Sequence, residues 1–145
     1  MMQTTRLFVY GTLQFPRIAT AVTGRHLRGA PARLDGYARH AVRGAPYPGI
    51  RPCAGASVEG LLLEAVDAAS RRRIDAFEGE LYRRERVTVH RLDKDTELAA
   101  EAYVVRPGAR CALAGHDWDP RAFAQRWHDR YLRELLGGRS AEVSG

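Results

Sequence analysis

The feature that most constrains the fold is a long alternating stretch at residues 81–92. Within it, apolar Val87 and Val89 are separated by polar Arg86 and Thr88. Because successive side chains of a β-strand point to opposite faces, this alternation predicts a strand with one buried face. Such a strand buries its apolar face within a sheet, so the rest of the chain must supply partner strands.

Further strands are predicted where short apolar or extended runs are bounded by turn residues. The first is the apolar run at residues 7–10, which Gly11 ends. The other predicted strands lie at residues 27–42, 57–65 and 99–105. The prolines and glycines at residues 44–49 are typical of a loop, and Pro107-Gly108 is typical of a turn.

Three segments carry helix signals instead. Residues 16–22 begin with a proline suited to a first helical turn, and residues 67–77 begin with Asp67 as a helix N-cap. Asp119 and Pro120 form a third start signal. Apolar side chains then recur every four residues, at Phe123, Trp127, Tyr131 and Leu135. We predict that this stripe packs into the core, and that the whole is an α+β domain with a closed or nearly closed sheet.

Length and composition fit one ordinary globular domain. The 145 residues are 45% hydrophobic and 28% charged, which predicts a single domain over residues 1–136 and a flexible polar tail at 137–145. No apolar run is long enough to cross a membrane, and no secretory signal is visible. Cys53 and Cys111 have no CxxC spacing. We expect both cysteines to be reduced and at least half-buried, in a cytoplasmic protein.

The charge balance is basic, with 23 Lys and Arg against 17 Asp and Glu, a formal net charge of +6. A basic protein attracts polyanions in general. The cations are scattered, however, and their short clusters at residues 71–73 and 83–86 are not interleaved with aromatic side chains. Because no nucleic-acid recognition module accompanies them, we expect a solvated arginine-rich surface and no nucleic-acid binding.

The common catalytic and cofactor motifs are missing from the sequence. It contains no GxxxxGK[ST], GxGxxG, HExxH or GxSxG pattern. The five histidines have no metal-ligand spacing, and the cluster of His116 and Asp117 beside Asp119 is explained by the helix cap. The sequence therefore predicts neither a metal nor a cofactor.

The first candidate for function is the turn Tyr10-Gly11-Thr12-Leu13 at the end of the first predicted strand. A strand that stops at a glycine leaves successive backbone N–H groups unpaired, and such groups can hold an anion or a developing oxyanion. Glycine also lets a ligand approach the backbone closely. The alternative is that Gly11 only turns the chain.

The second candidate is Glu78, which follows Phe77 at the end of a predicted helix and precedes Gly79. The negative end of the helix dipole and an apolar neighbourhood both raise the pKa of a carboxyl group. A raised pKa suits a general acid or base that works near neutral pH. The alternative is a surface glutamate beside a helix end. Glu80 is the main rival acid, and the others lie on predicted strands, at Glu59, Glu64 and Glu101.

Several short segments together resemble the γ-glutamylcyclotransferase-like superfamily. The resemblance runs from about Leu7 to Leu136 and is strongest to the branch named after a plant avirulence-induced gene and to the γ-glutamylamine cyclotransferases. The segments that carry it are Phe8-Val9-Tyr10-Gly11-Thr12-Leu13-Gln14, Arg43-Gly44, Tyr47-Pro48, Val58-Glu59-Gly60, Asp75-Ala76-Phe77-Glu78, Leu81-Tyr82-Arg83-Arg84 and Ala102-Tyr103-Val104.

The resemblance implies a small mixed β-barrel with flanking helices and a cofactor-free reaction. In that reaction the free α-amine of a γ-glutamyl compound attacks its own side-chain amide and releases 5-oxoproline and an amine or amino acid. The family's essential glutamate falls on Glu78. Its substrate-binding turn falls on Tyr10, Gly11, Thr12 and Leu13, and its late-strand tyrosine falls on Tyr103. Tyr82 is expected to pack on the apolar face of its strand.

The resemblance indicates a reaction class and not a named substrate. The turn reads Tyr-Gly-Thr-Leu, where the cytosolic enzymes that act on γ-glutamyl amino acids have a serine-asparagine variant. Two other functions stay open at this point. One is a binding module that holds a γ-glutamyl or carboxylate ligand in the same pocket without turnover. The less favoured one is a basic polyanion-binding protein.

Overall fold

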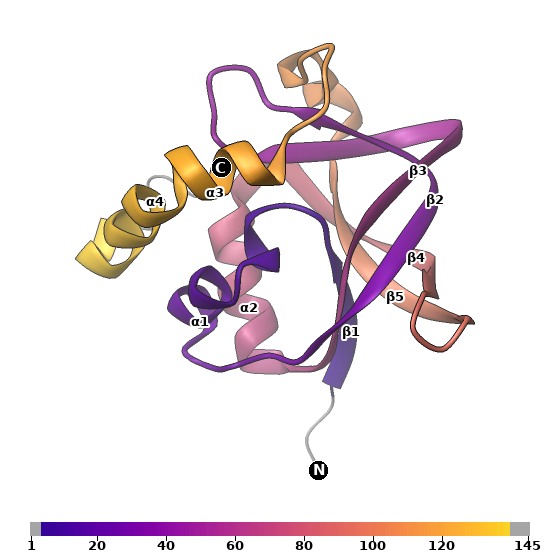
Figure 1. The fold of residues 1–145 in the computed structure, drawn as a ribbon, viewed down its shortest axis with the longest axis horizontal. Helices are drawn as coiled ribbons and strands as arrows, with labels where there is room; N and C mark the ends of the chain where they lie inside the picture. The colour runs from indigo at the N-terminus through magenta and orange to yellow at the C-terminus, as the bar shows by residue number, and fades with distance from the viewer. Residues whose placement is uncertain (1–3, 140–145) are drawn as a thin grey trace.

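The structure, a computed structural model, describes residues 4–139 and contains five strands around a common interior (Figure 1). The strands are β1 (Thr4–Val9), β2 (Gly29–Ala41), β3 (Pro48–Asp67), β4 (Tyr82–Arg91) and β5 (Thr96–Val105). They form a closed barrel in the order β1-β3-β2-β4-β5. The predicted α+β fold with a small mixed barrel and flanking helices is confirmed.

The barrel closes through two narrow seams. β1 meets β5 in parallel at the single pair Leu7 and Glu101, whereas every other pairing is antiparallel. The second seam joins β2 to β4 at two pairs, Ala32 with Arg91 and Arg33 with His90. Long ladders between β2 and β3 and between β4 and β5 therefore supply most of the sheet.

Four α-helices lie on one side of the barrel, at the left of the view in Figure 1. They are α1 (Pro16–Thr23), α2 (Ala68–Glu78), α3 (Pro120–Arg126) and α4 (His128–Glu134). Short 3-10 turns are η1 (Thr12–Gln14), η2 (Gly79–Leu81) and η3 (Pro107–Ala112), and a π-helical turn, η4 (Leu135–Arg139), follows α4. The rest of the predicted flexible tail, from residue 140, lies outside the described residues.

Two buried clusters follow from the alternation of side chains along the strands. Phe8 and Tyr10 belong to the cluster inside the barrel, with Leu62 and Val104. Their neighbours Leu7 and Val9 point the other way and join a second cluster against the helices. That second cluster includes Ile74, Phe77, Phe123, Tyr131 and Leu135. The candidate site lies at this junction of barrel and helices.

The predicted strand at 57–65 was too short, because β3 begins at Pro48 and takes in the end of the predicted loop. Its glycines and prolines suggest breaks, but a long hairpin with β2 holds the strand together. The register shifts between Asp35 and Tyr37, where Gly36 has a φ of 83°. Pairing resumes at Tyr37 with Pro52 after Asp35 with Ser57, so Gly36 lies opposite residues 53–56, and this irregularity interrupts the ladder without ending either strand.

The helix cap predictions differ in their outcome. The Asp119 side chain accepts a hydrogen bond from the Arg121 N–H at 2.9 Å, as predicted. Asp67 stands at the N-cap of α2, but its side chain makes no capping hydrogen bond.

The predicted C-terminal core stripe is wrong at one position. Phe123, Tyr131 and Leu135 are buried, but the helix is interrupted at Trp127, whose side chain is 39% exposed. The backbone there has φ −121° and ψ −25°, away from helical values, and this separates α3 from α4.

The predicted burial of the cysteines is confirmed for Cys53 and wrong for Cys111. Cys53 is half-buried, whereas Cys111 is exposed because it lies on η3 at the surface. Among residues 4–139, no helix has the length and apolar character needed to cross a membrane.

Candidate active site

One pocket gathers every site residue that the sequence suggested. It encloses about 400 Å³ between the atoms, including the part open to solvent. Its wall contains Tyr10, Gly11, Thr12, Leu13, Glu78 and Tyr103. These residues come from the end of β1, from η1, from the end of α2 and from β5, so the fold brings together segments that are far apart in the sequence.

The turn after β1 lines this pocket and carries backbone N–H groups without an acceptor among the described residues. The turn η1 starts at Thr12. The Gln14 N–H donates to the Gly11 carbonyl and the Phe15 N–H donates to the Thr12 carbonyl, both at 3.1 Å. Within the described residues, the N–H groups of Gly11, Thr12 and Leu13 have no hydrogen-bond partner in the protein. The first N–H groups of a helical turn lack an internal acceptor, so they are available to an anionic ligand.

Gly11 is required here by close approach. A Cβ atom at this position would lie 2.8 Å from both Cδ and Cγ of Pro48. Pro48 begins β3 and is buried against the turn. Any larger residue would push the turn or the proline away, so the glycine fixes the position of the donor groups.

Glu78 is the last residue of α2, and Gly79 follows with a φ of 74°, a conformation that favours glycine. The side chain is partly buried and lines the pocket. Burial is the main cause that raises the pKa of Glu78 to about 8, and the negative charge of Asp75 raises it further. The predicted direction is correct, but the second cause is the neighbouring carboxylate of Asp75 and not the helix dipole.

Tyr103 is tied to that neighbouring carboxylate. Its hydroxyl donates to Asp75 Oδ1 at 2.5 Å. Arg84 donates to both carboxylate oxygens of Asp75, and its Nε lies 3.3 Å from Glu101 Oε1. Burial is the main cause that raises the pKa of Tyr103, so the hydroxyl keeps its proton. The network fixes the ring of Tyr103 in the pocket wall.

The Tyr10 side chain has a structural partner. Its hydroxyl donates to the backbone carbonyl of Tyr103 at 2.6 Å. Its own carbonyl accepts from Arg39 Nη1 at 2.9 Å, and Arg39 Nε donates to Asp117 at 2.8 Å. The end of β1 is thus anchored on both sides, which holds the following turn in place.

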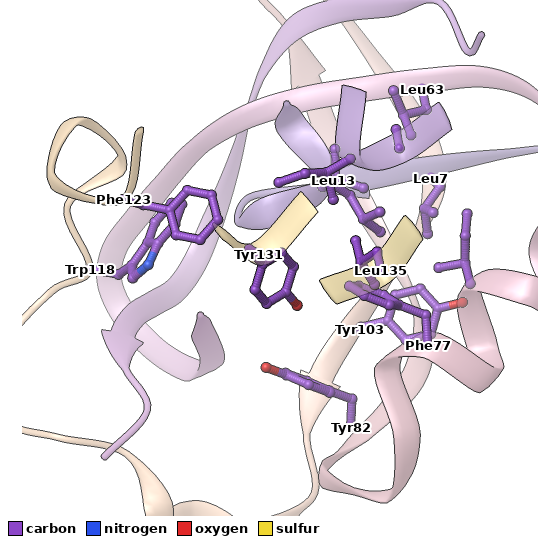
Figure 2. Packing of buried hydrophobic residues seen from close by; sticks show 14 of the residues in the cluster. Leu7, Leu13, Leu63, Phe77, Tyr82, Tyr103, Trp118, Phe123, Tyr131 and Leu135 are labelled. Atoms are coloured by element: carbon purple, nitrogen blue, oxygen red, sulfur yellow. The ribbon is translucent and has the colours of Figure 1, made fainter. Parts of the chain in front are cut away.

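Sequence reasoning missed part of the wall. Tyr47, Tyr82 and Tyr131 also line the pocket, and Figure 2 shows Tyr82 and Tyr131 with their hydroxyls directed toward the same space. The Tyr82 hydroxyl donates to the Pro48 carbonyl at 2.6 Å, so Tyr82 does more than pack on its strand. Asp75 was the one missed residue with a local signal, because it precedes Glu78 by one helical turn.

The rival acids lie elsewhere. Glu80 and Glu59 are exposed, Glu64 pairs with Arg91 at 2.9 Å, and Glu101 pairs with Arg84. None of the four lines the pocket. Over residues 4–139, no group of three or more His, Cys, Asp and Glu side chains is placed to hold a metal ion.

Comparisons with known proteins agree with this fold. A family profile described as "Gamma-glutamyl cyclotransferase, AIG2-like" matches residues 7–120. Protein AIG2 C of Arabidopsis thaliana is 34% identical over 102 residues, covering 70% of this chain. The match spans 62% of that relative, which is less than two thirds of its length.

Two solved structures extend the likeness to three dimensions. A solution structure from Arabidopsis thaliana has a TM-score of 0.72 at 28% identity, covering 94% of this chain and 82% of that chain. A structure described as a γ-glutamyl cyclotransferase has a TM-score of 0.63 at 12% identity, covering 92% and 86%, and shows a shared fold. With a family profile that spans most of its length, the chain belongs to the AIG2-like γ-glutamyl cyclotransferase family.

Proposed function

We propose that this protein is a γ-glutamyl cyclotransferase with Glu78 as its general acid and base. The α-amine nitrogen of a γ-glutamyl compound attacks the γ-amide carbonyl carbon, and the bond from that carbon to the amide nitrogen breaks. The products are 5-oxoproline and a free amine or amino acid. The reaction exchanges one amide for another, so no redox partner or activated donor enters its balance.

The properties of Glu78 support this role. The α-amine of the substrate is mostly protonated at pH 7, with a pKa of about 8, and must lose a proton before it attacks. A carboxyl group with a pKa of about 8 matches that amine, so the transfer between them costs little free energy. The same group then returns the proton to the departing nitrogen. Glu78 on the pocket wall could reach both nitrogens.

The turn supplies the complementary charge. Gly11, Thr12 and Leu13, whose N–H groups have no acceptor in the described protein, line the same pocket as Glu78. They would hold the α-carboxylate of the substrate or stabilise the oxyanion that develops on the attacked carbonyl. Both uses favour a folded conformer in which the amine lies near the carbonyl. Because ring closure is intramolecular, fixing that conformer is the main task of the protein.

Tyr103 would position the substrate. Its hydroxyl donates to Asp75, and its oxygen, which also lies beside Arg84, could accept a hydrogen bond from a substrate N–H. The observation that carries the proposal is that one pocket contains both a partly buried carboxyl group with a pKa of about 8 and a turn of unpaired N–H groups.

The test is incubation of the purified protein with γ-glutamyl dipeptides, glutathione and the isopeptide formed on the lysine ε-amine. Mass spectrometry measures 5-oxoproline, and a thermal shift assay run in parallel measures binding. We expect 5-oxoproline from at least one member of the panel. Thermal stabilisation without 5-oxoproline would support the non-catalytic binding module instead.

A further inference from the structure

Trp127 is a large aromatic residue that is not buried in the core. The spacing from Phe123 to Leu135 would bury it in one continuous helix, yet the break between α3 and α4 leaves it 39% exposed. Trp118, the other tryptophan, is buried, and its indole N–H donates to the Pro46 carbonyl at 2.7 Å. Trp127 is therefore the tryptophan whose ring is open to solvent.

A second pocket lies around this indole and adjoins the first. It is lined by Pro46, Tyr47, Trp127, Arg130, Tyr131 and Glu134, and encloses about 490 Å³ including the part open to solvent. Tyr47 and Tyr131 also line the pocket of Glu78. These two side chains therefore form a shared wall, which places the two pockets next to each other.

The chemistry of the second pocket is apolar. Its walls are three aromatic rings and a proline. The two charged side chains are occupied with each other and with the indole. Arg130 Nε lies 3.5 Å from Glu134 Oε1, and the Arg130 guanidinium lies 5.4 Å from the centre of the Trp127 ring. The two charges pair at the exposed rim, and the aromatic rings offer surface for stacking.

We propose that this second pocket binds an apolar, aromatic part of the leaving amine, with Trp127 as the residue that selects it. The inference deepens the proposed function and rests on it. The γ-glutamyl half would lie at Glu78, the scissile amide between Tyr47 and Tyr131, and the aromatic group against the indole. The substrate class is then a γ-glutamyl amide of an aromatic amine such as benzylamine.

Two synthetic substrates test the selection, γ-glutamyl benzylamide and γ-glutamyl methylamide. The methylamide has no group that reaches Trp127 and serves as the internal reference. We expect kcat/KM to favour the benzylamide by roughly tenfold, as a stacked and buried ring contributes. Trp127→Ala should remove most of that preference, and Trp127→Phe should restore part of it. Leu92→Ala is the matched control, because Leu92 is also 39% exposed and lines no pocket described here.

A binding measurement separates this inference from the proposed reaction. Isothermal titration calorimetry measures the affinity of each amide for the Glu78→Gln variant and for the double variant that carries both Glu78→Gln and Trp127→Ala. Tighter binding of the benzylamide that depends on Trp127, with no 5-oxoproline from wild type, would uphold the subsite and contradict the proposed reaction. Turnover of both amides at equal kcat/KM would uphold the reaction and overturn the subsite. Equal affinity for the two amides, or binding of neither, would also overturn it.

Discussion

Asp75 and Glu78 stand one helical turn apart on α2, and the charge of Asp75 adds to burial in raising the pKa of Glu78 to about 8. Asp75 is itself held by Arg84 and by the hydroxyl of Tyr103. The carboxylate that influences the candidate base is thus the one that positions the late-strand tyrosine. A single network links the proton affinity of Glu78 to the shape of the pocket.

The pH dependence of activity should follow that proton affinity. The reactive complex holds one proton between Glu78 and the substrate amine, and both groups have a pKa near 8. Well below pH 8, where both groups are protonated, we expect kcat/KM to fall about tenfold for each unit by which the pH is lowered. At alkaline pH, where both groups are deprotonated, kcat/KM should fall again. Initial rates between pH 5 and pH 10 measure this profile. A flat rate from pH 5 to pH 8 would contradict the assignment.

Removing the charge of Asp75 should shift the acid limb of that profile. In Asp75→Asn, Glu78 loses a repulsive neighbour, so its pKa should fall and the limb should move to lower pH. The same profile, recorded for Asp75→Asn and for Asp93→Asn, provides the measurement and its control. Asp93 is paired with Arg91 away from the pocket, and its replacement should leave the limb in place.

Glu78 should also make stability depend on pH. Because its pKa is raised from the ordinary value of 4.5, the folded state keeps a proton between pH 4.5 and pH 8 that the unfolded state has lost. Wild type therefore loses stability as pH rises across this range, and Glu78→Gln does not. We expect the variant to gain roughly 2–5 kcal/mol relative to wild type between pH 5 and pH 9.

Urea denaturation at the two pH values measures that gain. Glu80→Gln is the control, since Glu80 is exposed and outside the pocket. A difference between Glu78→Gln and wild type that stays constant with pH would show that Glu78 titrates normally.

The turn at Gly11 should tolerate no side chain. A Cβ at this position meets Pro48 at 2.8 Å, so Gly11→Ala should cost roughly 1–3 kcal/mol and should lower activity by displacing the N–H donors. Gly115→Ala is the matched control, because nothing lies within 4 Å of a Cβ there. Thermal denaturation and initial rates of both variants provide the comparison. Normal activity in Gly11→Ala would show that the reaction does not depend on the position of this turn.

Much of this site could be predicted from local patterns in the sequence. The place of Glu78 follows from Gly79, and the place of the donor turn follows from Gly11 at the end of a strand, because both depend on neighbouring residues. The remaining wall could not be found in this way. Tyr47, Tyr82 and Tyr131 come from three separate segments, and only the closure of the barrel and the packing of α4 bring them to Glu78.

Two of the wrong predictions concern the length of β3 and the burial of Trp127. β3 continues through Pro52 and Gly55 because β2 pairs with it on both sides of residues 53–56, which no window of β3 alone reveals. Trp127 lies outside the core because the helix breaks there, although its spacing is that of a continuous stripe. At β3, pairing with a neighbouring strand overrides a local preference, whereas at Trp127 the backbone itself departs from the helix that the spacing predicts.

The measurement that tests the central claim most directly is 5-oxoproline release by wild type, Glu78→Gln and Glu80→Gln on one γ-glutamyl substrate. Circular dichroism first establishes that all three are folded. We predict product from wild type and from Glu80→Gln and none from Glu78→Gln. Product from Glu78→Gln at the wild-type rate would contradict the account, because the carboxyl group that defines the pocket would then take no part in the reaction.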